Sequence, residues 1–173
     1  MSKVTPYPVP PGTALNAYAQ KPGYYTDCFA VEVDGTVDFA DYVEAFYTTP
    51  IFKAERLVLR VFAGLRSSDL DARQLALGKL DRFAAWQVAE RSDRQLLMKA
   101  IGRTSSWFMT QDCGTADGPR TRLLFGSVVA PKGPDGAAQP AMGPLFTALL
   151  GAHRVYSRLL LAAARRRILS FRR

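Results

Sequence analysis

The C-terminal part of the chain has the most regular pattern of hydrophobic and polar positions. Over residues 142–171 the apolar residues recur at helical spacing, so at about 100° per residue they gather on one side of a single long helix. This apolar side consists of Leu145, Phe146, Leu149, Leu150, His153, Tyr156, Leu160, Ala163, Ala164 and Ile168, and the opposite side carries Arg154, Arg158 and Arg165. The pattern predicts a long terminal helix that docks on a core through its apolar side.

Shorter patterns predict one strand and three helices in the first half of the chain. Aromatic and β-branched residues dominate residues 24–33, and turn-forming residues flank them, which is typical of a strand. Helical spacing follows over residues 38–49, with Asp38 as the expected N-cap, and resumes over residues 51–62 after a proline. Residues 68–78 have a serine before acidic residues at one end and a glycine at the other, so they are predicted to be a third helix.

The second half changes from helical to strand-like patterns. Residues 82–91, 95–103, 105–112 and 120–130 each read as a strand, and turn-prone residues separate them. The boundary near residue 103 is ambiguous, so residues 95–112 are alternatively one long bent strand. This succession predicts an antiparallel meander that leads into the terminal helix.

The order of elements predicts the fold class. A strand, several helices, a meander and a long terminal helix indicate an α+β helix-grip fold, in which a curved antiparallel sheet wraps around the C-terminal helix. With 173 residues, 48% of them hydrophobic, the chain is long enough for one well-cored domain. We expect that domain over residues 24–171, after an extended proline-rich N-terminal segment over residues 1–23.

Charge and composition restrict the classes of partner. The net charge is +8, but much of the excess is concentrated in Arg165, Arg166, Arg167, Arg172 and Arg173. Such a cluster complements the dipole at a helix C-terminus, and no nucleic-acid-binding module accompanies it, so no specific nucleic acid is expected. Weak contact with an anionic membrane surface stays open as an alternative. The proline-rich N-terminus does not resemble a secretory signal, so a cytoplasmic location is expected.

The reactive residue types do not form a metal or cofactor motif. Cys28 and Cys113 have no metal-ligand or redox spacing, and one histidine cannot supply a zinc site, so no metal and no cofactor are expected. Cys28 lies in a predicted strand and is typical of a small buried residue. A disulfide between the two cysteines requires that their strands be neighbours.

Three segments carry a resemblance to a known superfamily. Residues 103–108 (RTSSWF), the strand at 120–130 and residues 150–158 (LGAHRVYSR) resemble the START, polyketide-cyclase and birch-pollen-allergen-like helix-grip superfamily (SRPBCC). The chain is most similar to its uncharacterised bacterial families of unknown function whose terminal helix carries a His-Arg pair. The resemblance implies a hydrophobic cavity for lipids, polyketides or other apolar molecules, but no single chemistry. The chain shows fewer strands than the seven of the full pattern.

Several residues are candidates for the ligand site. His153 is the one candidate catalytic residue, since an imidazole can transfer a proton; the alternative is a buried histidine with a hydrogen-bond partner. Leu149 and Tyr156 share its side of the helix. The remaining ligand-binding candidates are Trp86, Trp107 and Met109 in the meander and Arg103, with core packing or an exposed arginine as the alternatives. Strand alternation places Trp107 and Met109 on one face and Phe108 on the other.

The leading interpretation is a binding protein rather than an enzyme. It would hold a small apolar molecule, such as a lipid or polyketide-like compound, between the sheet and the terminal helix. The first alternative is a cyclase- or dehydratase-type enzyme in which His153 transfers a proton. The second is an interaction module whose arginine-rich C-terminus contacts an acidic partner or a membrane.

Overall fold

Seven antiparallel strands form one curved, open sheet in the part of the chain that the computed structural model describes, residues 3–100, 102–131 and 144–171. In spatial order the strands are β1 (Thr5–Pro6), β2 (Tyr25–Asp34), β7 (Arg120–Val129), β6 (Thr104–Asp112), β5 (Gln95–Ala100), β4 (Trp86–Arg91) and β3 (Arg82–Phe83). With the long helix α5 (Pro144–Phe171) packed on one face, this architecture confirms the predicted α+β helix-grip fold. Only the backbone of residues 144–150 is described.

The expectation of fewer than seven strands is wrong. Two strands of two residues each complete the sheet, and both escape a pattern search because they are so short. β1 lies in the proline-rich N-terminal segment and pairs with β2. The single strand predicted over residues 82–91 is divided into β3 and β4 by a tight turn, in which Ala84 has a φ of 48°. Residues 95–112 form two paired strands rather than one bent strand.

Local capping explains where the helices begin and end. The structure contains α1 (Ala14–Ala19), α2 (Phe39–Tyr47), α3 (Pro50–Ala63) and α4 (Asp69–Ala76) before the meander. The side chains of Thr13, Thr49 and Ser68 each accept a hydrogen bond from the first turn of the helix that follows. Gly64 ends α3 in the left-handed conformation, with a φ of 66°. The three predicted helices of the first half are therefore confirmed, whereas α1 was not predicted.

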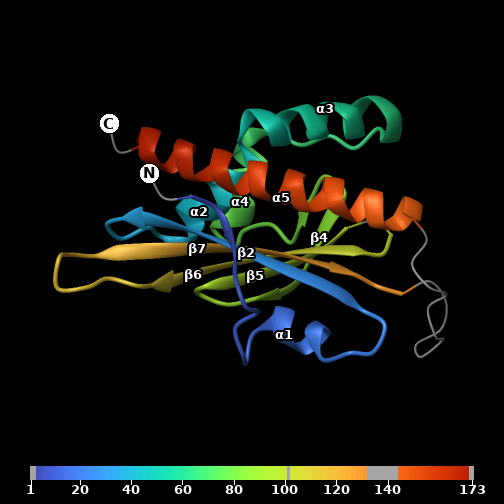
Figure 1. Cartoon of the computed structure of the whole chain (residues 1–173). Coiled ribbons are helices and arrows are strands. Elements are labelled where there is room, and N and C mark those ends of the chain that lie inside the picture. The colour runs from blue at the N-terminus through green and yellow to red at the C-terminus, as the bar shows by residue number, and fades with distance from the viewer. Residues whose placement is uncertain (1–2, 101, 132–143, 172–173) are drawn as a thin grey trace.

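The helices cover the two faces of the sheet unequally. α2, α4 and α5 pack on one face, with α3 outside them, and α1 packs on the other (Figure 1). Alternation along the strands separates two cores accordingly: Phe29 and Phe108 point toward the face covered by α2 and α5, whereas Cys28 and Trp107 point toward α1. We call these the inner and the outer face of the sheet.

The outer face explains why the N-terminal segment is not extended throughout. Leu15 of α1 is fully buried against the sheet, in the same cluster as Trp107. The Oε1 atom of Gln95 accepts hydrogen bonds from the backbone nitrogen of Ala14 (3.2 Å) and from Nε1 of Trp107 (3.0 Å). α1 is thus fixed to the sheet at its N-terminus, and the expected extended character of residues 1–23 is wrong for this part.

The apolar side predicted for the terminal helix is largely where α5 meets the sheet. Leu160, Ala164 and Ile168 are buried, and Leu161 joins them. The side chains of Leu145, Phe146, Leu149 and Leu150 lie outside the described residues. No described helix has the length and hydropathy that crossing a lipid bilayer requires.

Both cysteines are free thiols. Cys28 lies on β2 and Cys113 follows β6, and β7 separates these two strands in the sheet. Burial raises the pKa of the Cys28 thiol to about 12, so this thiol stays protonated and unreactive at neutral pH.

Candidate functional site

Aromatic side chains fill the middle of the inner face, where the resemblance implies a cavity. The ring centroid of Phe46 lies 4.8 Å from those of Phe108 and Phe125, and that of Tyr47 lies 4.8 Å from those of Phe52 and Phe83. Such distances are typical of packed aromatic clusters. The open spaces described below accordingly lie at the margins of the fold.

Trp107 and Met109 are on the wrong face of the sheet for the predicted site. Both belong to the outer cluster with α1, and Trp107 is fully buried there. The alternation predicted for this strand is confirmed, but Phe108, not Trp107, lies on the inner face, where its ring packs against α2. The prediction that Trp107 and Met109 line a cavity beneath the terminal helix is therefore wrong.

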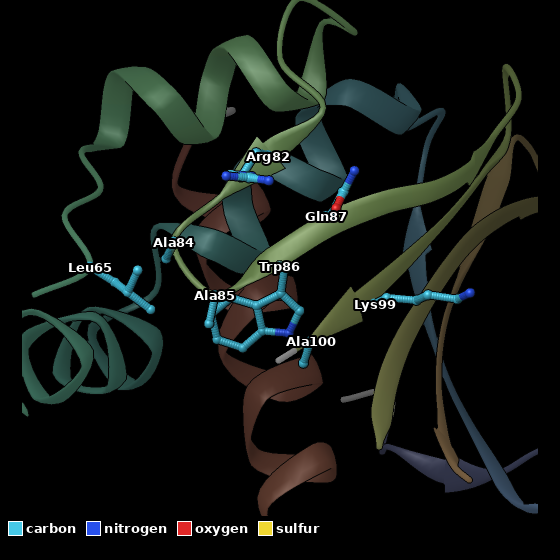
Figure 2. A pocket seen from close by; sticks show the side chains of 8 residues that line it. All are labelled: Leu65, Arg82, Ala84, Ala85, Trp86, Gln87, Lys99 and Ala100. Atoms are coloured by element: carbon cyan, nitrogen blue, oxygen red, sulfur yellow. The ribbon is translucent and has the colours of Figure 1, made fainter. Parts of the chain in front are cut away.

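Trp86 borders a pocket at the β3 edge of the sheet. This Trp86 pocket has a volume of about 380 Å³ and is lined by Leu65, Arg82, Ala84, Ala85, Trp86, Gln87, Lys99 and Ala100. In Figure 2 the indole lies between Ala85 and Ala100, and Leu65 approaches from the segment after α3. Trp86 itself is only 8% exposed and packs mainly against Tyr47 and Phe52, so most of its surface belongs to the core.

The side chain of Arg103 forms a hydrogen bond within the fold and does not line a pocket described here. It is exposed immediately before β6, and its Nη1 donates a hydrogen bond to the carbonyl oxygen of Ala130 (3.1 Å). This contact joins the beginning of β6 to the end of β7, which agrees with the exposed-arginine alternative. The other candidate, Leu149, lies in α5 with its side chain outside the described residues.

Tyr156 lies at the contact between α5 and α3, and His153 lies three residues before it on α5. The Tyr156 hydroxyl donates a hydrogen bond to Oε2 of Glu55 on α3 (2.5 Å). Burial raises the pKa of the Glu55 carboxyl, and the hydrogen bond from Tyr156 offsets part of this increase. His153 is half-buried, and its Nε2 atom is buried without a hydrogen-bond partner among the residues described. It lines neither the Trp86 pocket nor the groove described next.

A second space lies along α5, on the side of the β1 edge. This α5 groove has a volume of about 410 Å³, and its lining comprises Lys3, Val4, Val31, Val155, Arg158, Leu159, Ala162, Arg165 and Arg166. Val4 precedes β1 and Val31 lies on β2, so the start of the chain and β2 form one wall of the groove and α5 forms the other. Four of these nine lining residues are cations and none is a carboxylate.

Arg158 and Arg165 reach back toward the sheet instead of into solvent. The guanidinium of Arg158 lies over the Phe29 ring, 5.0 Å from its centroid, and its Nε atom is buried without a hydrogen-bond partner in the described part of the chain. Nε of Arg165 donates a hydrogen bond to the carbonyl oxygen of Glu32 (3.0 Å). Sequence periodicity placed both arginines on the polar side of the helix, because it does not show that long side chains can bend around its edge.

No cluster of metal-ligating side chains is found in the described ranges. The chain matches no family model, and no curated protein matches it in sequence.

Proposed function

We propose that the protein binds a small molecule with an apolar body and an acidic group in the α5 groove. This proposal keeps the binding function that the helix-grip resemblance implies, and moves the ligand from the filled interior to the margin of α5. It also treats the chain as a member of the superfamily it resembles, and the curved open sheet with one long helix supports that assignment.

The walls of the groove suit the apolar part of such a ligand. Val4, Val31, Val155 and Leu159 present only hydrocarbon, and the volume of about 410 Å³ lies within the range of small-molecule sites. Val155 and Leu159 are 56% and 52% exposed, so a bound hydrocarbon chain would remove them from water.

The single observation that carries the proposal is the state of Arg158. A buried donor without a partner costs about 1–3 kcal/mol, and a carboxylate or phosphate oxygen would satisfy it with a charge-assisted hydrogen bond. The cation–π contact with the Phe29 ring already restricts the guanidinium, so less side-chain freedom is lost on binding. Lys3, Arg165 and Arg166 add positive charge around the same opening.

The two alternatives have less support from the geometry. His153 does not contribute to the α5 groove, so a ligand held there would not meet the candidate proton donor. In the arginine-rich C-terminus, Arg165 and Arg167 are engaged within the fold, the second through a hydrogen bond from Nε to Oγ1 of Thr48 (2.6 Å). A binding protein for an amphipathic anion is therefore the function that the structure supports best.

Displacement of a fluorescent anion tests this proposal. Anilinonaphthalene sulfonate, which joins a planar apolar body to an acidic group, should bind at one site, and decanoate but not decanol should displace it. Arg158→Gln should weaken decanoate binding at least about tenfold, because it removes the charge-assisted hydrogen bond. Arg158→Lys should have an intermediate effect, since it keeps the charge but not the planar donor set.

Arg154→Gln is the matched control, because Arg154 is exposed on the same helix and is not part of the groove lining. It should bind both compounds as the wild type does. Unchanged decanoate binding in a correctly folded Arg158→Gln variant would refute the proposed site.

A further inference from the structure

Helix α3 presents an apolar surface that the fold leaves uncovered. Leu57, Val58, Val61 and Phe62 are 59%, 54%, 65% and 84% exposed, and we call these four residues the α3 face. The opposite side of the same helix is packed, with Phe52 buried in the core and Leu59 resting against it. Large apolar side chains gathered at this exposure generally mark an interaction surface rather than random surface variation.

Positive charge flanks the α3 face. Lys53 and Arg56 are both paired with Asp69, at 2.5 and 2.7 Å, whereas Arg60 and Arg66 are exposed and make no ion pair within the residues described. The only carboxylate in α3 is Glu55, which accepts the hydrogen bond from Tyr156 on the side of α5. An apolar strip with free cations beside it and its own carboxylate turned inward is complementary to an anionic surface.

The solvent-exposed side of α5, which faces away from the sheet, extends this surface. α3 and α5 together form the layer farthest from α1 (Figure 1), and the Tyr156–Glu55 hydrogen bond joins them. Val155 and Leu159 are exposed on α5, where Arg154 and Arg166 are exposed as well. The layer therefore repeats the same combination of apolar and basic side chains on two adjacent helices.

We infer that the α3 face inserts into the interface of a membrane that contains anionic lipids. The helix has no serine, threonine, asparagine or glutamine, so it offers few directional hydrogen bonds to a protein partner. A lipid interface needs only buried apolar area and electrostatic attraction, and α3 supplies both. This inference rests on α3 alone; Val155, Leu159 and Arg166 of α5 also line the α5 groove, so the substitutions that should weaken membrane binding are all in α3.

Co-sedimentation with lipid vesicles tests the inference on the full chain. The protein should bind phosphatidylcholine vesicles that contain phosphatidylglycerol, bind vesicles of phosphatidylcholine alone much more weakly, and dissociate as salt is raised. Val61→Ser combined with Phe62→Ser should weaken binding by about tenfold or more, because both side chains are exposed and their loss reduces the area that can be buried. Arg60→Gln should weaken it roughly fivefold.

Two matched controls separate α3 from general surface effects. Leu70→Ser with Leu77→Ser changes two apolar side chains that are 62% and 53% exposed at α4, and Arg94→Gln removes an exposed cation from the β4–β5 turn. Both should bind vesicles as the wild type does. Absence of vesicle binding, or equal losses in the α3 and control variants, would overturn the inference. So would light scattering that shows a dimer dissociated by the Val61 and Phe62 substitutions, because the face would then be a contact between copies.

Discussion

At the scale of single residues, Gly126 shows how closely the outer face is packed. A Cβ atom added at this position of β7 would overlap Cδ2 of Leu15 and lie 2.9 Å from the carbonyl oxygen of Asp27. Leu15 is buried and the carbonyl belongs to the neighbouring strand, so neither can move without disturbing the sheet. We predict that Gly126→Ala lowers the free energy of unfolding by about 1–3 kcal/mol, measured by urea denaturation.

A second glycine is the control for this substitution. A Cβ atom at Gly151, on the exposed side of α5, would meet nothing within 4 Å. Gly151→Ala should therefore leave stability unchanged or raise it by up to about 1 kcal/mol, through helix propensity alone. If Gly126→Ala is as stable as the wild type, the contact between α1 and β7 is not close enough to exclude a methyl group.

Sequence patterns predicted which residues share a face, but not which face meets which helix. The alternation at Trp107, Phe108 and Met109 is confirmed. Because the sequence pattern did not predict α1, helices were expected on only one face of the sheet, and the placement of Trp107 and Met109 on that face was wrong. Arg158 illustrates the complementary difficulty. Its Cα lies on the polar side of α5, while its guanidinium reaches the Phe29 ring. Periodicity predicts where each Cα lies around the helix. It does not predict the direction of a long side chain, which depends on the residues that pack around it.

At the scale of elements, the hydrogen bond between Tyr156 and Glu55 links α5 to α3 and makes their contact sensitive to pH. Burial raises the pKa of Glu55 in the folded state above its ordinary value of 4.5. Its contribution to stability is therefore fully present below the unfolded-state pKa and is lost as pH rises through the folded-state pKa. Glu55→Gln keeps a hydrogen-bond acceptor without the charge, so we predict that it is more stable than the wild type at pH about 7, and that this advantage disappears near pH about 4.

Urea denaturation of both proteins across this pH range gives the measurement. Tyr156→Phe provides an informative comparison, because the hydrogen bond that it removes lowers the pKa of Glu55. Its loss should raise that pKa further and extend the pH-dependent decrease in stability to higher pH. A stability difference between wild type and Glu55→Gln that does not change with pH would show that the carboxyl titrates as it does in the unfolded chain.

The sequence predicted the helices and strands that are bounded by capping or turn residues. It did not predict the elements that form only because of tertiary contacts. β2, α2, α3 and α4 have clear flanking residues or caps, and their observed ends lie close to the predicted ones. β1 is a two-residue strand in a proline-rich segment, and it exists because β2 offers it an edge. α1 has only six residues, too few to be stable without the tertiary contacts of Leu15.

At the scale of the whole molecule, the helix-grip architecture has a filled centre, and the two proposed binding features lie at its margins. The aromatic cluster occupies the inner face, so the α5 groove lies at the edge between α5 and the sheet, and the α3 face lies on the solvent side of α3. The architecture was predictable from the order of elements. The filling of its centre by aromatic side chains was not predictable. The volume between a sheet and a helix depends on how many large side chains point inward, and strand alternation alone does not set that number.

The contacts of β1 and α1 with the sheet determine how much the N-terminal segment contributes to the stability of the fold. Removing residues 1–22 would delete β1 and α1 and uncover Trp107, Leu97 and Leu124, all of which are buried on the outer face. We predict that this truncation lowers the free energy of unfolding by at least about 3 kcal/mol, since α1 contributes the fully buried Leu15. In a Trp86→Phe background, the emission of Trp107 should also shift to longer wavelength as its indole meets water. Leu15→Ala in the full chain should reproduce part of the loss. A truncated protein with unchanged stability and unchanged Trp107 emission would show instead that the sheet needs only one layer of helices.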